Sequence, residues 1–190
     1  METEQSARGA ELQELFALIR ERSFRRGKFT LASGRESEMY FNLKPTMMHP
    51  RGALLAAHAF LARIRAEGVD LVGGLEMGAV PLMGSLAALS EKEGRPVRTF
   101  FVRKKQKQHG TRELIEGLGP GESLKGSRVM IVDDVATTGG SILDAAHTAR
   151  EAGASVDAAL VIIDRGEGAA ENLARENIRL LSVFRGSEFL

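Results

Sequence analysis

RVMIVDDVATTGGS (residues 128–141) joins an apolar, β-branched run to two adjacent aspartates and a turn of threonine, glycine and serine. The apolar residues 129–132 show no polar alternation, which predicts a strand covered on both faces, as in a parallel sheet. Asp133 and Asp134 follow at the carboxyl end of this strand, where open α/β sheets bind ligands. The apolar pattern then predicts a helix from Ser141 to Ala152. The segment therefore predicts a strand, a ligand-binding turn and a helix in that order.

The turn between this strand and this helix has the composition of a phosphate site. Residues 137–141 lead into the helix N-terminus, so main-chain N–H groups, the Thr138 and Ser141 hydroxyls and the helix dipole favour one dianion. Two carboxylates beside a phosphate repel it unless they meet another group, and vicinal ribose hydroxyls donate well to carboxylates. The pattern thus indicates a ribose 5-phosphate. For the acid pair or the glycines taken singly, a simple strand end and helix cap is the alternative.

The segment IVDDVATTGGS (residues 131–141) resembles the phosphoribosyl pyrophosphate signature of the type I phosphoribosyltransferases. The resemblance implies that the two acids hold the ribose hydroxyls and that the turn holds the 5-phosphate. The implied binding residues are Asp133, Asp134, Val135, Ala136, Thr137, Thr138, Gly139, Gly140 and Ser141. The signature leaves the acceptor open, and regulators that bind the same ligand without catalysis also carry it.

The composition fits one α/β domain. The chain has 190 residues, of which 43% are hydrophobic, enough to bury a core. Its 26 basic and 25 acidic residues give a net charge of +1, so no global field recruits nucleic acid or a membrane. Cysteine is absent, which excludes disulfides and thiolate chemistry and fits a reducing compartment. The polar first residues do not form a secretory signal, and we expect a cytoplasmic protein.

Apolar patterns along the rest of the chain predict alternating strands and helices. Helices are predicted at residues 11–22, 52–67, 79–92 and 141–152 and from 169, and strands at 29–31, 39–42, 70–74, 97–102, 128–132, 155–163 and 178–183. Strands separated by helices indicate right-handed βαβ crossovers. We predict a Rossmann-like parallel sheet flanked by helices, the type I phosphoribosyltransferase fold, in a single domain 1–190. Residues 46–165 form its core, and residues 1–45 with about 166–190 form a small hood.

A long basic connection lies between the strand ending at Val102 and the strand beginning at Arg128. Such a length predicts a lid or a disordered loop. The cationic residues at the start of this connection suit the binding of a second charged group such as pyrophosphate. The charge taken by itself is explained by a loop that is exposed to solvent. The pattern R-K-x-x-K-x-H-G resembles the catalytic loop of the orotate phosphoribosyltransferases. The resemblance implies that Arg103, Lys104, Lys107 and His109 contact pyrophosphate, with Lys104 entering the other subunit's site in a homodimer with shared active sites.

Two segments concern the acceptor base. FTLASGRESEMYFN (residues 29–42) resembles part of the orotate pocket of that family, which implies that Tyr40 and Phe41 lie against the pyrimidine ring; by composition alone they are core residues. Arg165 follows the strand 155–163, where a guanidinium can form a bidentate pair with a planar carboxylate. Orotate has this carboxylate, whereas uracil and the purines lack it. DRGEG (residues 164–168) resembles the family motif D-R-x-E-G, which implies that Arg165 and Thr137 contact orotate.

The chain departs from some bacterial members of the family at two lysines. Ala32 stands before the Ser33-Gly34 turn, and GGLEMGAVP (residues 73–81) contains no lysine. The backbone amides of residues 76–79, together with Lys28 or Lys44, are the candidates that replace those contacts.

The resemblance implies a Mg²⁺-dependent displacement at the anomeric carbon of phosphoribosyl pyrophosphate. Orotate replaces pyrophosphate and gives orotidine 5-phosphate, a step of pyrimidine biosynthesis. The implied catalytic residues are Lys104, Lys107, His109, Asp133 and Asp134, and magnesium is held through pyrophosphate and the ribose hydroxyls rather than by protein ligands. Two alternatives stay open: transfer to another base, and a sensor that regulates nucleic acid without catalysis. The near-neutral charge argues against the sensor.

Overall fold

The computed structural model describes residues 2–30, 36–69, 71–104 and 114–190. The helices are α1 (Glu2–Arg22), α2 (Lys44–Met47), α3 (Pro50–Ala66), α4 (Val80–Lys92), α5 (Gly140–Glu151) and α6 (Ala169–Arg175), with a 3-10 helix η1 (Gly186–Phe189). The strands are β1 (Phe24–Thr30), β2 (Glu36–Phe41), β3 (Leu71–Leu75), β4 (Arg98–Val102), β5 (Ile115–Glu116), β6 (Arg128–Ala136), β7 (Ser155–Asp164) and β8 (Arg179–Arg185).

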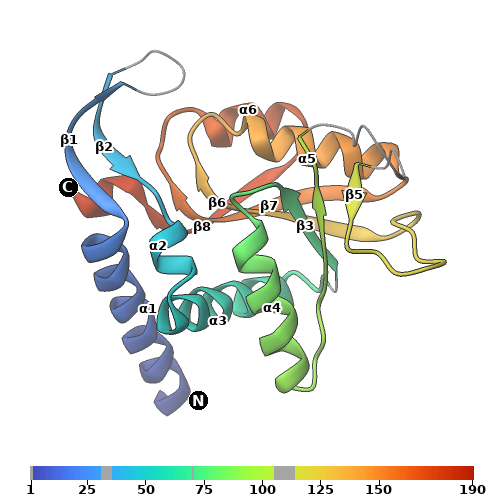
Figure 1. Cartoon of the computed structure of the whole chain (residues 1–190), viewed down its shortest axis with the longest axis horizontal. Helices are drawn as coiled ribbons and strands as arrows, with labels where there is room; N and C mark the ends of the chain where they lie inside the picture. The colour runs from blue at the N-terminus through green and yellow to red at the C-terminus, as the bar shows by residue number, and fades with distance from the viewer. Residues whose placement is uncertain (1, 31–35, 70, 105–113) are drawn as a thin grey trace.

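A central sheet organises the molecule. Within the described residues it has six strands in the order β5-β4-β3-β6-β7-β8, and only β5 runs antiparallel to its neighbour. Helices α3 and α4 pack on one face and α5 and α6 on the other, as Figure 1 shows. The side chains of Val129–Val132 in β6 have no solvent exposure, as expected for a strand covered on both faces. The predicted parallel sheet flanked by helices is confirmed.

The order of the strands places a binding crevice between β3 and β6. From β3 the chain moves outward to β4, and it then returns to β6 on the other side of β3 and continues to β7 and β8. Such a reversal leaves a crevice beyond the carboxyl ends of the two central strands, which is where open α/β sheets bind ligands. The carboxyl end of β6 carries Asp133 and Asp134.

Several elements differ from the sequence prediction, among them β6, α1 and the long basic connection. Strand β6 continues to Ala136 rather than ending at Val132, because β7 keeps pairing with it through Val135–Ile163 and Ala136–Asp164. The two aspartates therefore lie inside the strand. Helix α1 begins at Glu2 rather than residue 11. The long basic connection contains the short strand β5, which pairs with β4 at the edge of the sheet.

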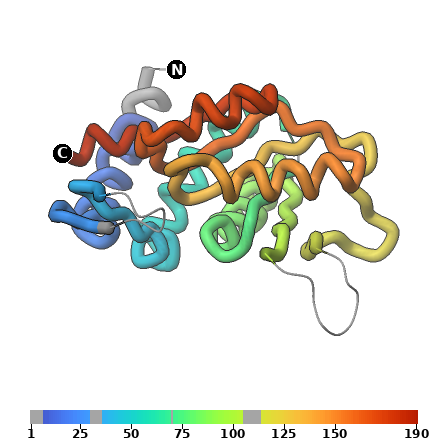
Figure 2. The backbone as a smooth tube through the Cα atoms, turned by 90° about the horizontal axis from the view of Figure 1, so that it is seen from above, coloured from blue at the N-terminus to red at the C-terminus, as the bar shows by residue number. Residues whose placement is uncertain are grey.

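The hairpin of β1 and β2 packs beside the C-terminal segment. The two strands are antiparallel, as predicted, while the predicted turn at Ser33-Gly34 lies outside the described residues. Figures 1 and 2 both show the hairpin and the C-terminus at the same end of the molecule. An aromatic cluster joins them: the ring centroid of Phe189 lies 4.2 Å from that of Phe16 and 5.3 Å from that of Phe41. The rings of Phe24 and Phe184 complete the cluster, at 5.7 and 6.0 Å from Phe189.

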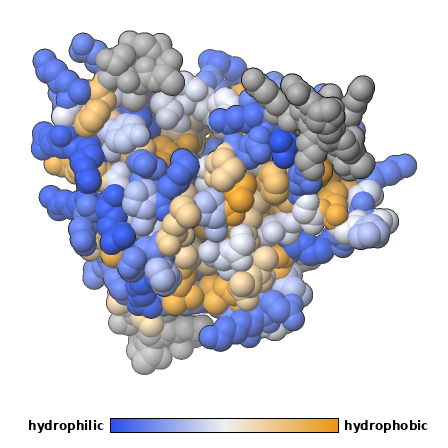
Figure 3. Space-filling view, in the orientation of Figure 1, coloured by the Kyte–Doolittle hydropathy of each residue, from blue (hydrophilic) through white to orange (hydrophobic). Residues whose placement is uncertain are grey.

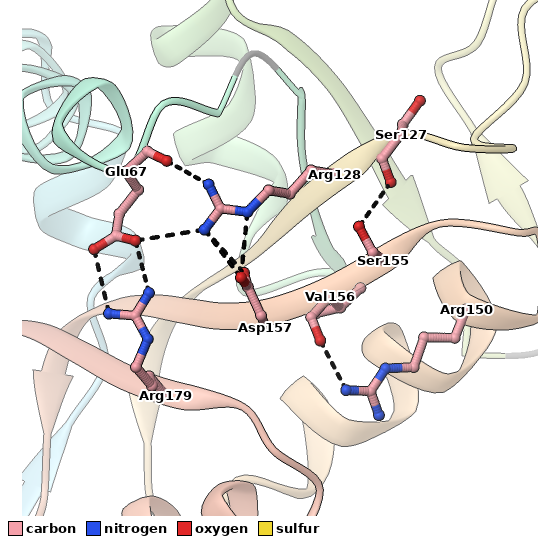
Figure 4. Close-up of polar contacts among 8 residues, drawn as sticks. All are labelled: Glu67, Ser127, Arg128, Arg150, Ser155, Val156, Asp157 and Arg179. Carbon is pink, nitrogen blue, oxygen red and sulfur yellow. Dashed lines mark hydrogen bonds and ion pairs between the residues drawn. The ribbon is translucent and has the colours of Figure 1, made fainter.

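A charge network ties together α3, β6, β7 and β8 at the strand starts, away from the crevice (Figure 4). The carboxylate of Glu67 lies 2.7 Å from the Arg179 guanidinium and 3.6 Å from that of Arg128. Arg128 also pairs with Asp157 at 3.0 Å. The hydrogen bond from Arg179 lowers the pKa of Glu67. Because these groups are partly exposed, the network contributes little stability beyond fixing the register of the strand starts.

The surface is mixed in polarity. Figure 3 shows hydrophilic side chains along the edge formed by α1 and hydrophobic side chains in the middle of the same face, over α4. Met48 and Met77 are the most exposed large apolar side chains among the described residues, at 73% and 58%. None of the helices in the described part of the chain has the length and apolar character needed to cross a membrane.

Candidate active site

The acid pair of β6 is the most buried charged feature of the crevice. Asp133 is only 6% exposed, and its Oδ1 accepts the N–H of Asp134 at 2.9 Å. Oδ1 of Asp134 in turn accepts the N–H of Val135 at 2.9 Å. Burial and then the nearby Asp134 carboxylate raise the pKa of Asp133 to about 8, while the Lys104 ammonium works in the opposite direction. Asp133 therefore holds a proton at neutral pH until hydroxyl donors or a cation arrive to stabilise its charge.

A cavity of about 360 Å³ opens above the acid pair. Its walls come from the turn after β3, the end of β6, the start of α5, helix α2 and the end of β4. The lining residues are Lys44, Leu75, Glu76, Met77, Gly78, Lys104, Asp133, Asp134, Val135 and Ser141. The volume and the mixture of acids, cations and hydroxyl suit a small polar ligand.

Gly78 lets the turn after β3 approach the acids. A Cβ atom built on Gly78 would lie 2.6 Å from Oδ1 of Asp133 and 2.8 Å from Oδ1 of Asp134, closer than real Cβ atoms come. Any larger residue would therefore push into the two carboxylates. The sequence marked this turn for its backbone amides, but the need for glycine follows only from the contact with β6.

The turn from residue 137 to 141 leads from β6 into α5, as the sequence predicts. Gly139 has a φ of 84°, which L-residues with side chains rarely adopt. The Asn172 side chain of α6 donates to the carbonyl of Thr138 at 2.9 Å and holds the turn from outside. The turn is thus shaped in advance, with the N-terminus of a twelve-residue helix behind it.

Arg165 lies immediately beyond β7 and beside this turn. Its N–H donates to the carbonyl of Ala136 at 3.0 Å, which places it next to Thr137. Its side chain is 5% exposed and donates to the Ser37 hydroxyl at 2.8 Å and the Met39 carbonyl at 3.1 Å. Glu167 pairs with the same guanidinium at 2.7 Å. The buried Nε has no hydrogen-bond partner within the described residues, so a donor remains for a ligand.

The two aromatic residues expected at the base have different surroundings. Phe41 is 8% exposed and packs in the aromatic cluster against Phe24 and Phe189. It therefore occupies the core position that we gave as its alternative. Tyr40 is 44% exposed and lies against the ring of Phe29, with their centroids 5.4 Å apart. Tyr40 is the aromatic surface of the hairpin that a ligand can reach.

The basic residues of the long connection are described only in part. Lys104 lines the cavity of its own chain, whereas the sequence resemblance placed it in the other subunit's site. Arg103 lies beside it and approaches Glu116 of β5 at 3.9 Å. Lys107 and His109 lie outside the described residues, as does Ala32. Of the two candidate replacement lysines, Lys44 lines the cavity.

Sequence reasoning missed two members of this site. Ser37 supports Arg165 through its hydroxyl, and Glu167 supplies a carboxylate to the same guanidinium. Both stand in the segments that the acceptor resemblance quoted, so the signal was present there. Among the described residues, no group of three or more His, Cys, Asp or Glu side chains is arranged to hold a metal ion.

Comparison with known proteins identifies relatives along nearly the whole chain. A family model described as a phosphoribosyl transferase domain matches residues 48–178. The orotate phosphoribosyltransferase of Bradyrhizobium sp. strain BTAi1 is 50% identical over 184 residues, which cover 97% of this chain and 100% of that protein. The orotate phosphoribosyltransferase of Thermosynechococcus vestitus is 41% identical and covers 93% of this chain and 91% of its own.

Solved structures agree with these matches. The crystal structure of Mycobacterium tuberculosis orotate phosphoribosyltransferase in complex with Fe(III) dicitrate superposes with a TM-score of 0.80 at 35% identity, covering 94% of this chain and 98% of that one. The structure of the same enzyme with 5-phospho-alpha-D-ribosyl 1-diphosphate gives a TM-score of 0.76 at 32% identity, with the same coverage. The similarity therefore extends across the sheet, the hairpin and the crevice.

Proposed function

Because the chain belongs to the phosphoribosyl transferase family, we propose from this premise that it is an orotate phosphoribosyltransferase. It transfers the 5-phosphoribosyl group from phosphoribosyl pyrophosphate to orotate and releases pyrophosphate and orotidine 5-phosphate, a reaction of pyrimidine biosynthesis. The observation that carries this proposal is the buried acid pair of β6, which opens to a cavity beside the turn that begins α5.

The phosphoribosyl end of the donor fits the geometry from β6 to α5. Asp133 and Asp134 accept hydrogen bonds from the ribose hydroxyls, and this contact favours the ionised form of Asp133. The 5-phosphate occupies the turn of residues 137–141, where the helix N-terminus favours negative charge. Val135 and Ala136 contribute main chain at the bend between the two subsites. This division explains how carboxylates and a phosphate share one small crevice.

The pyrophosphate end lies toward the turn after β3. We assign Lys104 to this group as a leaving-group electrophile, since it lines the cavity together with Glu76 and Gly78. Lys44 also lines the cavity and replaces one of the two missing family lysines. Arg103, Lys107 and His109 are proposed to contact pyrophosphate because their segment resembles the catalytic loop of the orotate phosphoribosyltransferases. Stabilising charge on the departing group is the main catalytic requirement, because no protein nucleophile is needed.

Magnesium is the proposed cofactor. The residues present fit this role, because two carboxylates stand side by side in the cavity wall and can orient the ribose hydroxyls that would meet a hard cation. Bound with phosphoribosyl pyrophosphate, magnesium neutralises charge on the pyrophosphate. Asp133 and Asp134 would hold it through the ribose hydroxyls, and the protein keeps both carboxylates fixed through their hydrogen bonds to the main chain.

Selectivity for orotate is assigned to Arg165. Its buried Nε needs a partner, and the planar carboxylate of orotate supplies one. Thr137 stands beside Arg165 because the main chain of Arg165 bonds to Ala136. We assign the exposed ring of Tyr40 to the face of the pyrimidine, supported from the core by Phe41. Uracil, hypoxanthine and adenine offer no carboxylate to the Nε of Arg165, so we expect poor transfer to them.

We further propose a homodimer with shared active sites. Met48, Leu54 and Met77 are exposed, and Met77 lines the cavity; such apolar surface suits burial against a second copy. Light scattering tests the dimer. Mixing Lys104→Ala with Asp133→Asn subunits tests sharing, and recovery of about a quarter of wild-type activity, the statistical share of intact sites, would place Lys104 across the interface. No recovery would mean that Lys104 serves its own cavity.

One assay tests the proposed activity. Pyrophosphate release is measured with phosphoribosyl pyrophosphate and Mg²⁺ while orotate, uracil, hypoxanthine and adenine are offered separately. We expect turnover with orotate and a loss of at least about a hundredfold in kcat/KM for orotate in Arg165→Ala, because a buried charge-assisted pair is lost. Turnover with another base would reassign the acceptor, and donor binding without turnover would favour the sensor.

A further inference from the structure

Glu76 joins the turn after β3 to the end of β4. Its Oε1 accepts the backbone N–H of Lys104 at 3.0 Å, 28 residues further along the chain. Its own N–H donates to the carbonyl of Val102 at 2.8 Å. Glu76 thus bonds to the main chain on both sides of Arg103: its N–H binds Val102, and its side chain binds Lys104.

The position of this carboxylate is unexpected for a site that binds a polyanion. Glu76 lines the same cavity as Asp133 and Asp134, and the proposed function places pyrophosphate there. A third negative charge would oppose that ligand by simple repulsion. The hydrogen bond to Lys104 offers a reason for the acid to be present, because a charged acceptor binds an amide N–H more strongly than a neutral one.

Within the described residues, the residue that Glu76 holds, Lys104, is one of the two lysines that line the cavity. Lys104 is exposed at the end of β4 and lines the cavity opposite the acid pair. The four-carbon side chain of Lys104 is flexible and can reach many positions. The direction of the main chain at Lys104 therefore decides which of these positions the ammonium group occupies most. Fixing the Lys104 N–H restricts that direction. The neighbouring N–H of Arg103 is held separately by the Leu114 carbonyl at 2.8 Å.

We propose that Glu76 is a positioning residue, which accepts the Lys104 N–H and so keeps the Lys104 ammonium at the cavity for the pyrophosphate group of the donor. The proposal rests on the proposed function, because that function identifies the group that Lys104 meets. Glu76 acts as a hydrogen-bond acceptor, whose charge strengthens the bond to the Lys104 N–H, and not as a charge that meets the ligand. This distinction separates the role from a direct contact between the Glu76 carboxylate and a magnesium ion or its water.

Three substitutions at Glu76 separate the acceptor from the charge. Glu76→Gln keeps an acceptor oxygen, and Glu76→Met keeps the length but offers no strong acceptor. Glu76→Ala removes both. We expect Gln to stay within about threefold of wild-type kcat/KM for phosphoribosyl pyrophosphate, while Met and Ala lose about 10- to 30-fold, the size expected for one charge-assisted hydrogen bond. The KM for orotate should not change. Glu91→Ala, in an exposed acid of α4, is the matched control.

The double variant with Lys104→Ala tests whether Glu76 acts through Lys104. If it does, adding Glu76→Ala to Lys104→Ala lowers kcat/KM by less than about twofold further, because the cation that Glu76 positions is already gone. Full multiplication of the two losses would overturn the proposal, and so would equal losses in Gln and Ala. Thermal unfolding of each variant checks folding, and Met replaces Ala in the double variant if Ala proves unstable.

The wild-type assay keeps this proposal distinct from the proposed function. Absence of orotate turnover in wild-type protein would remove the proposed function. Normal wild-type turnover with an equally active, folded Glu76→Met variant would remove only the positioning role.

Discussion

The guanidinium of Arg165 donates to the hydroxyl of Ser37 at 2.8 Å, across 128 residues of sequence. The same hydroxyl donates to the carbonyl of Met39 at 3.0 Å, so Ser37 is itself fixed by the hairpin. Arg165 lies beyond the last residue of β7, and Ser37 lies in β2. This contact therefore joins the hairpin to the segment after β7. It helps to orient the Arg165 side chain, which we assign to orotate binding.

Replacing Ser37 by Ala is expected to weaken orotate binding selectively. Loss of the hydroxyl removes one contact of the Arg165 Nη2 and leaves those with the Met39 carbonyl and Glu167, which allows the side chain to reorient. We expect the KM for orotate to rise about 5- to 20-fold while the KM for phosphoribosyl pyrophosphate changes less than about twofold. Steady-state kinetics with each substrate varied in turn measures both. Ser155→Ala, at the starts of the strands in Figure 4, is the control. Equal changes in both KM values would contradict the assigned role.

The raised pKa of Asp133 predicts a pH-dependent loss of stability. Burial and Asp134 raise this pKa from 3.8 to about 8 in the folded chain. Between these values the folded chain holds a proton that the unfolded chain has lost, so stability falls as the pH rises through that window. Asp133→Asn cannot ionise and so removes the cost of burying a charged carboxylate. Its free energy of unfolding should exceed that of wild type by about 1–3 kcal/mol at pH 8, with a smaller gain at pH 5. Urea unfolding at the two pH values measures it.

The Asp133→Asn variant should lose activity although it gains stability. An amide cannot take the negative charge that the ribose hydroxyls and magnesium stabilise, so Asp133→Asn should lose most of its turnover while gaining stability. Asp144→Asn, in a surface acid of α5, serves as the control and should change neither property. Parallel pH profiles for wild type and Asp133→Asn would show that this carboxyl does not titrate as the structure implies.

The parts of the site that are local in sequence could be predicted from the sequence. Strand β6, the acid pair and the turn of residues 137–141 are contiguous, and each has a pattern with a direct physical meaning. Contacts between distant segments could not be predicted. The hydrogen bond between Ser37 and Arg165 and the approach of Gly78 to Asp133 depend on how β2, β3 and β6 are arranged in space.

The errors in the fold prediction also have physical causes. Residues 2–10 of α1 are mostly polar, so no apolar stripe marks that part of the helix. Strand β5 has two residues and exists as a partner of β4, which no local pattern reveals. The carboxyl end of β6 was placed too early because Asp133 and Asp134 look like a strand end, whereas pairing with β7 continues past them.

Gly78 should not tolerate even alanine. The added Cβ would meet Oδ1 of Asp133 and of Asp134, and both oxygens are already bonded to main-chain N–H groups. Relief of the clash therefore moves the acids that hold the ribose. We expect Gly78→Ala to lose at least about tenfold in kcat/KM for phosphoribosyl pyrophosphate.

Gly84→Ala is the matched control for this change. Gly84 lies inside α4 with nothing within 4 Å of a built Cβ. Alanine there should stabilise the chain by about 0.5–1 kcal/mol through helix propensity and leave the kinetics unchanged. A Gly78→Ala variant with wild-type kinetics would mean that the turn after β3 does not approach the acids as closely as described.

Phe189 should carry much of the stability that joins the hairpin to the sheet. It is 3% exposed, and its ring packs against Phe16 of α1, Phe24 of β1, Phe41 of β2 and Phe184 of β8. Replacing Phe189 by Ala removes contacts with four elements and leaves a cavity that the surrounding rings cannot fill. We therefore expect a loss of about 3–5 kcal/mol in the free energy of unfolding. The neighbouring Leu190→Ala, at a side chain 52% exposed, should cost less than about 0.5 kcal/mol. Urea unfolding at 25 °C compares the two. Equal stabilities would show that the aromatic cluster does not hold the hairpin against β8, and the orientation of Arg165 through Ser37 would then need another support.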